Sequence, residues 1–310
     1  MRVEDGGAVI TFLERTVARA AASYQADGRF LAALRIAYGA WIIFLPVDIT
    51  WIAGLPDDFV NPRPGLFGFI HSVPPIELLV AISVVRFVLA VLLVIGIATI
   101  PVSLFLTLTI MAAAGLSYSF SKVDHFILFE LVPVFLGLAG WGSRWSLDAV
   151  IRRRRGRTPA VTRGVPILLF AFTIGWGMLS AAAPKIAGGW LDPTRDATRG
   201  YLAKDIAADD KLGALGPWML TFDNHLFWKA LDYATIAAEG LLFFFVLTPL
   251  LFRCWLALLS CFHIAVFLTL GISFIDYTLV YAVFFAPAVM WVVRRASIGR
   301  AVEPSQELRA

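Results

Sequence analysis

Residues 165–190 read VPILLFAFTIGWGMLSAAAPKIAGGW, and this stretch decides how the rest of the chain is interpreted. From Val165 to Ala183 the residues are almost all apolar, over a length that nearly crosses a bilayer as a helix. The run ends at a Pro-Lys pair, so Lys185 lies where the apolar segment meets a polar loop. An ammonium group at that border is costly unless it is paired, hydrated or neutral. We therefore predict a membrane-spanning helix, with Lys185 either snorkelling at its end or forming part of a polar site.

The whole chain has the composition of a membrane protein. Of its 310 residues, 59% are hydrophobic and 15% are charged, whereas soluble domains have about 25% charged residues. Apolar segments that cross a bilayer, or nearly so, number about eight. We therefore predict an all-α integral membrane protein, a bundle of about eight transmembrane helices. The predicted spans are Phe30–Ile52, Ile76–Ile97, Pro101–Tyr118, Asp124–Trp141, Gly164–Ala183, Tyr233–Leu251, Arg253–Leu270 and Phe274–Val293.

The placement of arginines predicts the orientation. They cluster before the first span, between the fourth and fifth spans, and after the eighth. An even number of spans puts these clusters on one side, which the positive-inside rule makes cytoplasmic. We expect the plasma membrane, with a cytoplasmic segment 1–29, a transmembrane domain 30–293 and a cytoplasmic tail 294–310. Residues 184–232 mix both charge signs with many aromatic residues, which predicts interfacial helices that form an outer lid.

Polar residues in or beside the predicted spans indicate a pocket on the outer side. Ionisable groups at membrane depth usually face the bundle interior and pair with one another. Structural roles are the competing interpretation: Arg35 and Arg86 would pair with Glu77 or Glu239, and His263 would bond a backbone carbonyl. The candidate site residues are Lys185, His125 and His263 in catalytic roles, supported by Arg35, Glu130, Trp190, Glu239 and Asp276.

Several classes of site are not expected. The sequence contains no metal-ligand spacing, no P-loop, no dinucleotide-binding glycine motif and no GxSxG element. We therefore predict no metal site and no nucleic-acid partner. Cys254 and Cys261 lie in one apolar segment, where a helix would separate them by about 10 Å along its axis. That is too far for a disulfide.

Five short elements, in this order, resemble the horizontally transferred transmembrane (HTTM) domain family, which includes the vitamin K-dependent gamma-glutamyl carboxylases. The resemblance extends from about Leu31 to Met290. The elements are LRIAYG around Arg35, DHFILF at Asp124–Phe129, RWSLD at Arg144–Asp148, KIAGGW at Lys185–Trp190 and CFH at Cys261–His263, which is followed by GISFIDY.

The resemblance implies a site and a chemistry. Lys185 would be a neutral base that deprotonates a vitamin K-like quinol, His125 would be its partner, and His263 a further histidine of the site. The implied partners are the lipid bilayer and either a secreted peptide or a lipophilic small molecule. Two departures argue against propeptide-directed carboxylation: Pro184 replaces the second lysine of the carboxylases, and no large luminal domain is expected after the last span.

Two other hypotheses belong to different classes. One is a transporter or a non-catalytic accessory protein, for example in the maturation or export of a secreted peptide. The absence of an internal repeat argues against a transporter. The other is a quinone-linked subunit of the DoxX type, but such proteins have fewer spans than this chain predicts.

Overall fold

The computed structural model describes residues 4–61, 68–120, 126–208 and 213–290. The predicted tail 294–310 and His125 lie outside these ranges. Within them all regular secondary structure is helical, which confirms the all-α part of the predicted fold class. The elements are α1 (Glu4–Tyr24), α2 (Gly28–Phe44), η1 (Thr50–Gly54), η2 (Asp57–Phe59), α3 (Ile76–Ile95), α4 (Thr99–Tyr118), α5 (Ile127–Glu130), α6 (Val132–Ala139), α7 (Leu147–Arg154), α8 (Val165–Ala187), α9 (Ala197–Ala207), α10 (Gly216–Leu220), α11 (His225–Gly240), η3 (Leu242–Phe245), α12 (Pro249–Leu270), α13 (Tyr277–Ala282) and η4 (Val283–Phe285).

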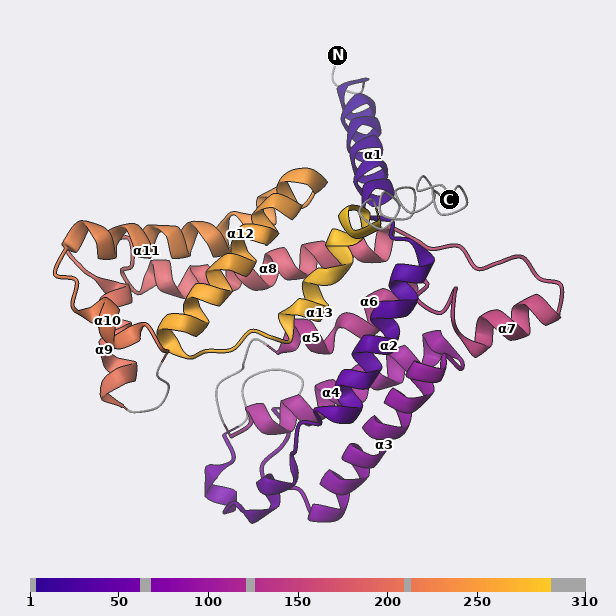
Figure 1. Ribbon diagram of the computed structural model, residues 1–310, viewed down its shortest axis with the longest axis horizontal. Coiled ribbons are helices and arrows are strands. Elements are labelled where there is room, and N and C mark those ends of the chain that lie inside the picture. The colour runs from indigo at the N-terminus through magenta and orange to yellow at the C-terminus, as the bar shows by residue number, and fades with distance from the viewer. Residues whose placement is uncertain (1–3, 62–67, 121–125, 209–212, 291–310) are drawn as a thin grey trace, which may run out of the picture. The chain divides into compact units, whose positions relative to one another are not determined.

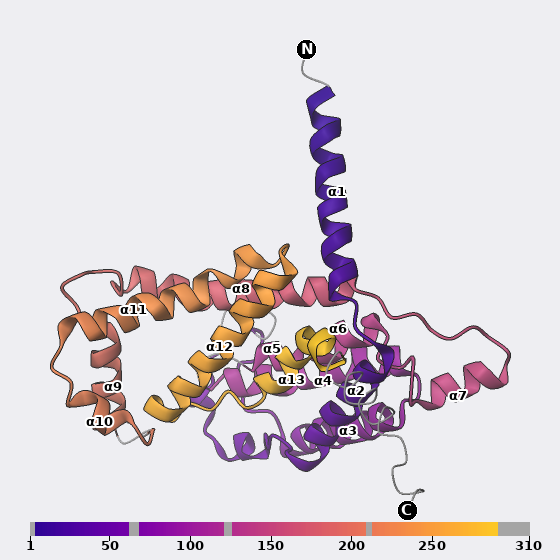
Figure 2. The same ribbon diagram turned by 45° about the horizontal axis from the view of Figure 1, so that its top comes forward.

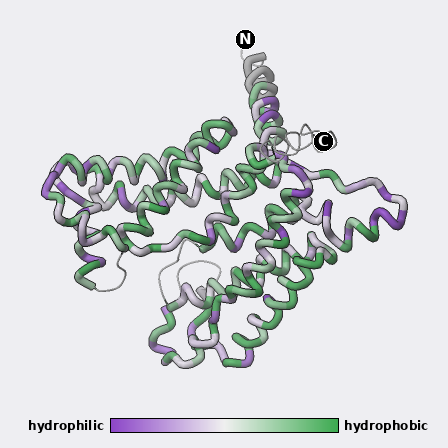
Figure 3. The backbone as a smooth tube through the Cα atoms, in the orientation of Figure 1, coloured by the Kyte–Doolittle hydropathy of each residue, from purple (hydrophilic) through white to green (hydrophobic). Residues whose placement is uncertain are grey.

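Four of the described helices are long and apolar enough to cross a membrane: α3, α4, α8 and α12, with 20, 20, 23 and 22 residues. At 1.5 Å per residue each reaches about 30 Å, the thickness of the hydrocarbon core. Apolar residues run along α3 (Figure 3), and most of them are unburied within the protein. The chain is therefore membrane-embedded. Two shorter apolar helical stretches, Ile127–Ala139 and Tyr277–Met290, fall within two further predicted spans.

The chain divides into two compact units. The first comprises Met1–Tyr24 and Leu168–Thr278, and the second comprises Gln25–Ile167 and Leu279–Ala310. In the second unit, α2 packs on α3, α3 on α4, and α4 on α6 (Figure 1). The packing holds because Leu31, Leu93, Leu106 and Leu136 are fully buried between these helices.

A cluster of polar contacts closes the turn between α3 and α4, where Gly96 adopts a left-handed φ of 79°. The Asp148 carboxylate accepts hydrogen bonds from the backbone amides of Ala98 (2.8 Å) and Thr99 (2.7 Å). It therefore caps the N-terminus of α4, whose first amides have no partner within the helix. We name Arg35, Gly96, Trp145 and Asp148 the turn clamp.

Arg35 completes the turn clamp from α2. Its guanidinium donates to the carbonyls of Leu93, Val94 (2.9 Å) and Trp145 (2.5 Å). The first two carbonyls end α3 and lack helical partners of their own. The prediction that Arg35 pairs with Glu77 or Glu239 is therefore wrong. Arg86 likewise bonds a carbonyl, that of Val47, at 2.5 Å.

In the first unit, α8 contacts α11 and η3, which in turn pack on α12, and the three segments run in alternating directions (Figure 2). Phe243 of η3 contacts the rings of Phe172 and Trp176 in α8. The Trp255 indole of α12 donates to the Ala238 carbonyl of α11 at 2.9 Å. These contacts align α11 with the C-terminal half of α8, which brings their polar residues together.

Candidate functional site

Lys185 lies in the last turn of α8, because the helix continues through Pro184 to Ala187. The helix therefore extends four residues beyond the predicted end of the apolar run at Ala183. Gly189 then adopts a left-handed φ of 84°, and the Trp190 amide bonds back to the Lys185 carbonyl at 3.1 Å. This reversal places the Lys185 ammonium 5.8 Å from the centre of the Trp190 ring, within the range of a cation–π contact. The KIAGGW element is thus a lysine, a glycine turn and the tryptophan that the turn folds back.

Glu239 of α11 is the charged partner of Lys185. The Lys185 Nζ atom lies 2.6 Å and 2.5 Å from the two carboxylate oxygens of Glu239. The two side chains are 27% and 10% exposed. Of the alternatives open for a lysine at the end of an apolar helix, the structure therefore shows pairing. We call these two residues the Lys185–Glu239 pair.

The Lys185–Glu239 pair is one end of a polar row on α11. His225, Lys229, Asp232 and Glu239 follow one another at spacings of four, three and seven residues. These spacings place the side chains on one face of a helix. We name these residues the α11 polar face. The sequence contained this periodic signal, but three of the four residues were not among the candidate site residues, because they precede the predicted span.

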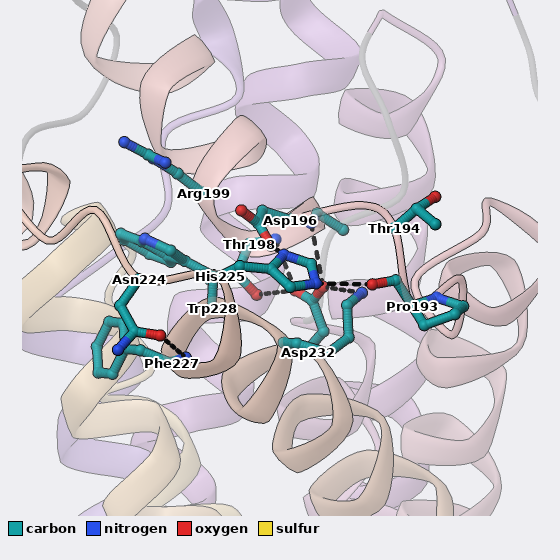
Figure 4. Close-up of polar contacts among 12 residues, drawn as sticks. Pro193, Thr194, Asp196, Thr198, Arg199, Asn224, His225, Phe227, Trp228 and Asp232 are labelled. Atoms are coloured by element: carbon teal, nitrogen blue, oxygen red, sulfur yellow. Dashed lines mark hydrogen bonds and ion pairs between the residues drawn. The ribbon is translucent and has the colours of Figure 1, made fainter.

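Asp232 is the most buried member of the α11 polar face, with no exposed side-chain surface. Its carboxylate accepts bonds from Lys229 (2.7 Å) and from the amides of Ala197 (3.1 Å) and Thr198 (2.7 Å). It therefore caps α9 from a neighbouring helix (Figure 4). Burial raises the pKa of Asp232, but the hydrogen bonds from Lys229 and Thr198 together lower it by more than burial raises it. The pKa of Asp232 therefore lies below the usual value.

Lys229 forms a buried ion pair with Asp232 and links Asp232 to Lys185 through Trp190. Its Nζ atom also donates to the Trp190 carbonyl at 3.2 Å, while the Trp190 ring lies beside the Lys185 ammonium. Trp190 thus contacts both lysines, one through its backbone and one through its ring. We expect a change at either lysine to move Trp190 and so affect the other.

His225 begins α11 and joins it to the loop before α9. Its Nδ1 atom lies 2.6 Å from an Asp196 carboxylate oxygen, and its Nε2 atom lies 2.7 Å from the Pro193 carbonyl (Figure 4). A carboxylate and a carbonyl are both acceptors, so both contacts form together only when both ring nitrogens carry hydrogen.

The other predicted site residues have separate environments. His263 is buried in α12, where its ring stacks on Phe274 with centroids 4.1 Å apart and meets Tyr277 edge-on. Glu130, in the other unit, accepts a hydrogen bond from the Tyr118 hydroxyl at 3.0 Å. Asp276 is half-buried between α12 and α13. The contacts seen for Lys185 thus involve two of the predicted residues, Glu239 and Trp190.

No group of three or more potential metal ligands occurs in the described part of the chain. Comparisons of the sequence and structure with known protein families, with curated proteins and with solved structures find no match.

Proposed function

We propose that this protein is an HTTM-type membrane enzyme in which the Lys185–Glu239 pair removes a proton from a lipophilic acid, such as a quinol. The observation that supports this proposal is the pair itself, an amine and a carboxylate in contact at the end of an apolar helix. Desolvation favours the neutral amine with a protonated carboxyl group over the ammonium and carboxylate, because buried charges are costly.

The proton balance of the step is simple. An ammonium with a carboxylate has the same number of protons as a neutral amine with a carboxylic acid. Transfer of one proton along the hydrogen bond from Lys185 to Glu239 exposes the amine as a base. The amine then takes the hydroxyl proton of the quinol, which leaves a quinolate, a lysine ammonium and a protonated Glu239. A neighbouring ammonium stabilises the quinolate anion that forms.

We further propose that the transmembrane domain has about eight spans, as the sequence predicts. In the second unit, Asp148 contacts the start of α4. The chain leaves α4 at its opposite end, at Tyr118. The chain must return along α5 and α6 to reach the start of α4 again, which supports a crossing there. Arg35 of α2 contacts the same end, whereas Ile49 and Ile52 pack with Leu79 and Leu116 at the opposite end. This arrangement supports a crossing by α2 and the residues after it.

The alternating directions of α8, α11 with η3, and α12 (Figure 2) support the next crossings in the same way. The proposed outer lid, residues 184–232, lies next to the proposed site, because the first turn of the lid contains Trp190. A quinol or another lipophilic substrate would enter from the bilayer. A secreted peptide would reach the same residues from the outer side.

Quinol deprotonation in a defined membrane tests the proposed chemistry. The full chain in nanodiscs is mixed anaerobically with a naphthohydroquinone, and the quinolate is followed by its absorbance. We expect Lys185→Ala and Lys185→Arg to remove the quinolate signal, because arginine does not deprotonate under these conditions. Glu239→Gln should reduce the signal strongly. Lys204→Met, which removes an exposed lysine of α9, should not change it.

A normal quinolate signal from well-folded Lys185→Ala protein would refute the proposed base. The alternative is then a non-catalytic accessory protein or transporter in which the Lys185–Glu239 pair only holds α8 to α11. That alternative predicts lower thermal stability for Lys185→Ala, together with normal maturation or export of a peptide once the variant is stabilised.

A further inference from the structure

The arginine-rich end of α7 is shaped by a glycine turn. Gly156 has a left-handed φ of 65°, and the Arg157 amide bonds back to the Arg152 carbonyl at 3.0 Å. This is a common way of ending a helix, since a left-handed glycine reverses the chain over the last turn. The reversal returns Arg157 to the side of α7 on which Arg152 lies.

The reversal creates a positively charged hollow of about 160 Å³, lined by Asp148, Ile151, Arg152, Arg155 and Arg157. Its one carboxylate, Asp148, is already bonded to Ala98 and Thr99 in the turn clamp. In the part of the chain that the structure describes, no carboxylate forms an ion pair with the three arginines. The hollow thus carries three guanidinium groups against one carboxylate, which leaves it with a net positive charge.

The turn clamp fixes the level of this hollow relative to the bilayer. Both α3 and α4 are long enough to cross a membrane, so the turn between them lies at one membrane surface. Asp148, in the first turn of α7, bonds that turn. Three exposed apolar side chains lie beside it: Trp145 is 60% exposed, and Leu147 and Ile151 are each 40% exposed. Apolar side chains next to guanidinium groups are typical of a segment that lies in the headgroup layer.

We propose that this hollow binds the phosphate-bearing headgroup of an anionic phospholipid through Arg152, Arg155 and Arg157. Guanidinium groups bond phosphate oxygens in pairs, and these bonds are stronger than those between neutral groups. The exposed Ile151 at the rim contacts the glycerol and upper acyl region. The polar C-terminal end of α7 is visible in Figure 3. The binding does not depend on any chemistry at Lys185.

Native mass spectrometry of the full chain, released from nanodiscs of phosphatidylcholine with increasing phosphatidylglycerol, tests the proposal. The test variant is R152Q/R155Q/R157Q, which removes the three lining arginines. The matched control is R153Q/R154Q/R163Q, which removes the same charge from exposed arginines outside the lining. We expect the test variant to bind phosphatidylglycerol roughly tenfold more weakly, and the control to stay within about twofold of the unmodified chain.

Equal loss in both variants would overturn the proposal, because binding would then follow the total charge of the segment. Displacement of phosphatidylglycerol by millimolar inorganic phosphate would overturn it too, since the site would then take a free anion. If the test variant fails to fold, R157Q alone serves in its place, because Arg157 follows the helix. Unchanged phosphatidylglycerol binding by folded R157Q would count against the hollow.

Discussion

At the scale of single residues, we expect Asp232 to contribute strongly to the stability of the folded protein. Its buried carboxylate holds Lys229 and the start of α9 together. Removing one partner of a buried pair leaves the other charge uncompensated, which costs about 3–5 kcal/mol. We expect Asp232→Asn to lower the free energy of unfolding by about 3 kcal/mol. Thermal unfolding in non-ionic detergent micelles measures this change.

Asp223 provides the matched control. It pairs with Arg199 at 3.0 Å, but its side chain is 90% exposed, and ion pairs in water contribute little. Asp223→Asn should therefore leave the midpoint of thermal unfolding unchanged. A similar loss in both variants would show that the lid responds to charge in general and not to the buried pair.

The buried Asp232 also predicts how the stability of the protein depends on pH. The pKa of folded Asp232 is lowered from the ordinary value of 3.8, so its contribution to stability is fully present above that value. The contribution is lost as the pH falls through the folded pKa. The stability difference between the unmodified chain and Asp232→Asn should be constant near neutral pH and shrink below about pH 4. A difference that grows on acidification would contradict the sign of this shift.

Residue types and spacing predicted only part of the candidate site. Lys185, Trp190 and Glu239 were selected because charged and aromatic groups at membrane depth are uncommon. The partnership of Lys185 with Glu239 was not predictable, since it joins residues 54 positions apart on helices whose relative rotation is set by packing. Asp232 and Lys229 were missed because hydropathy places them before a span and says nothing of their burial.

At the scale of elements, hydropathy located the most apolar helices closely. The predicted spans Ile76–Ile97 and Pro101–Tyr118 correspond to α3 and α4 within two residues at each end. Lipid-facing segments must bond their backbone internally, so a long apolar run has few alternatives to a helix. The segments that hydropathy could not define, such as α7 and α9, are fixed by caps: Ser146 caps α7, and Asp232 caps α9.

The α3–α4 turn supports a graded prediction about glycine. An alanine at Gly96 would combine a left-handed φ with contact against Ser146 and Arg35, so Gly96→Ala should cost more than about 1 kcal/mol. Gly156 has a left-handed φ but open space, and Gly156→Ala should cost only about 1 kcal/mol. Gly200 lies in α9 with open space, and Gly200→Ala should stabilise by about 0.5–1 kcal/mol. Thermal unfolding of the three variants checks this order, and a harmless Gly96→Ala would contradict the turn clamp.

At the scale of the whole molecule, the number of crossings decides on which side each loop lies. With about eight spans, Thr158 is cytoplasmic, while Asn61 and Asp223 are outside. With only the four longest helices crossing, Asn61 and Thr158 would share one side. Single cysteines at these three exposed positions, in a chain with Cys254→Ala and Cys261→Ala, can be labelled in intact cells with an impermeant maleimide. We expect labelling at Asn61→Cys and Asp223→Cys, and at Thr158→Cys only after lysis.

The turn clamp also has a consequence for synthesis. Asp148 follows Ala98 by 50 positions, so the α3–α4 hairpin leaves the ribosome well before its cap exists. Until then, water must satisfy the first amides of α4, and the hairpin enters the bilayer with an open turn. The arrival of α7 closes that turn afterwards. A substitution of Asp148 should therefore leave insertion of the α3–α4 hairpin unchanged and slow the final folding of the complete chain.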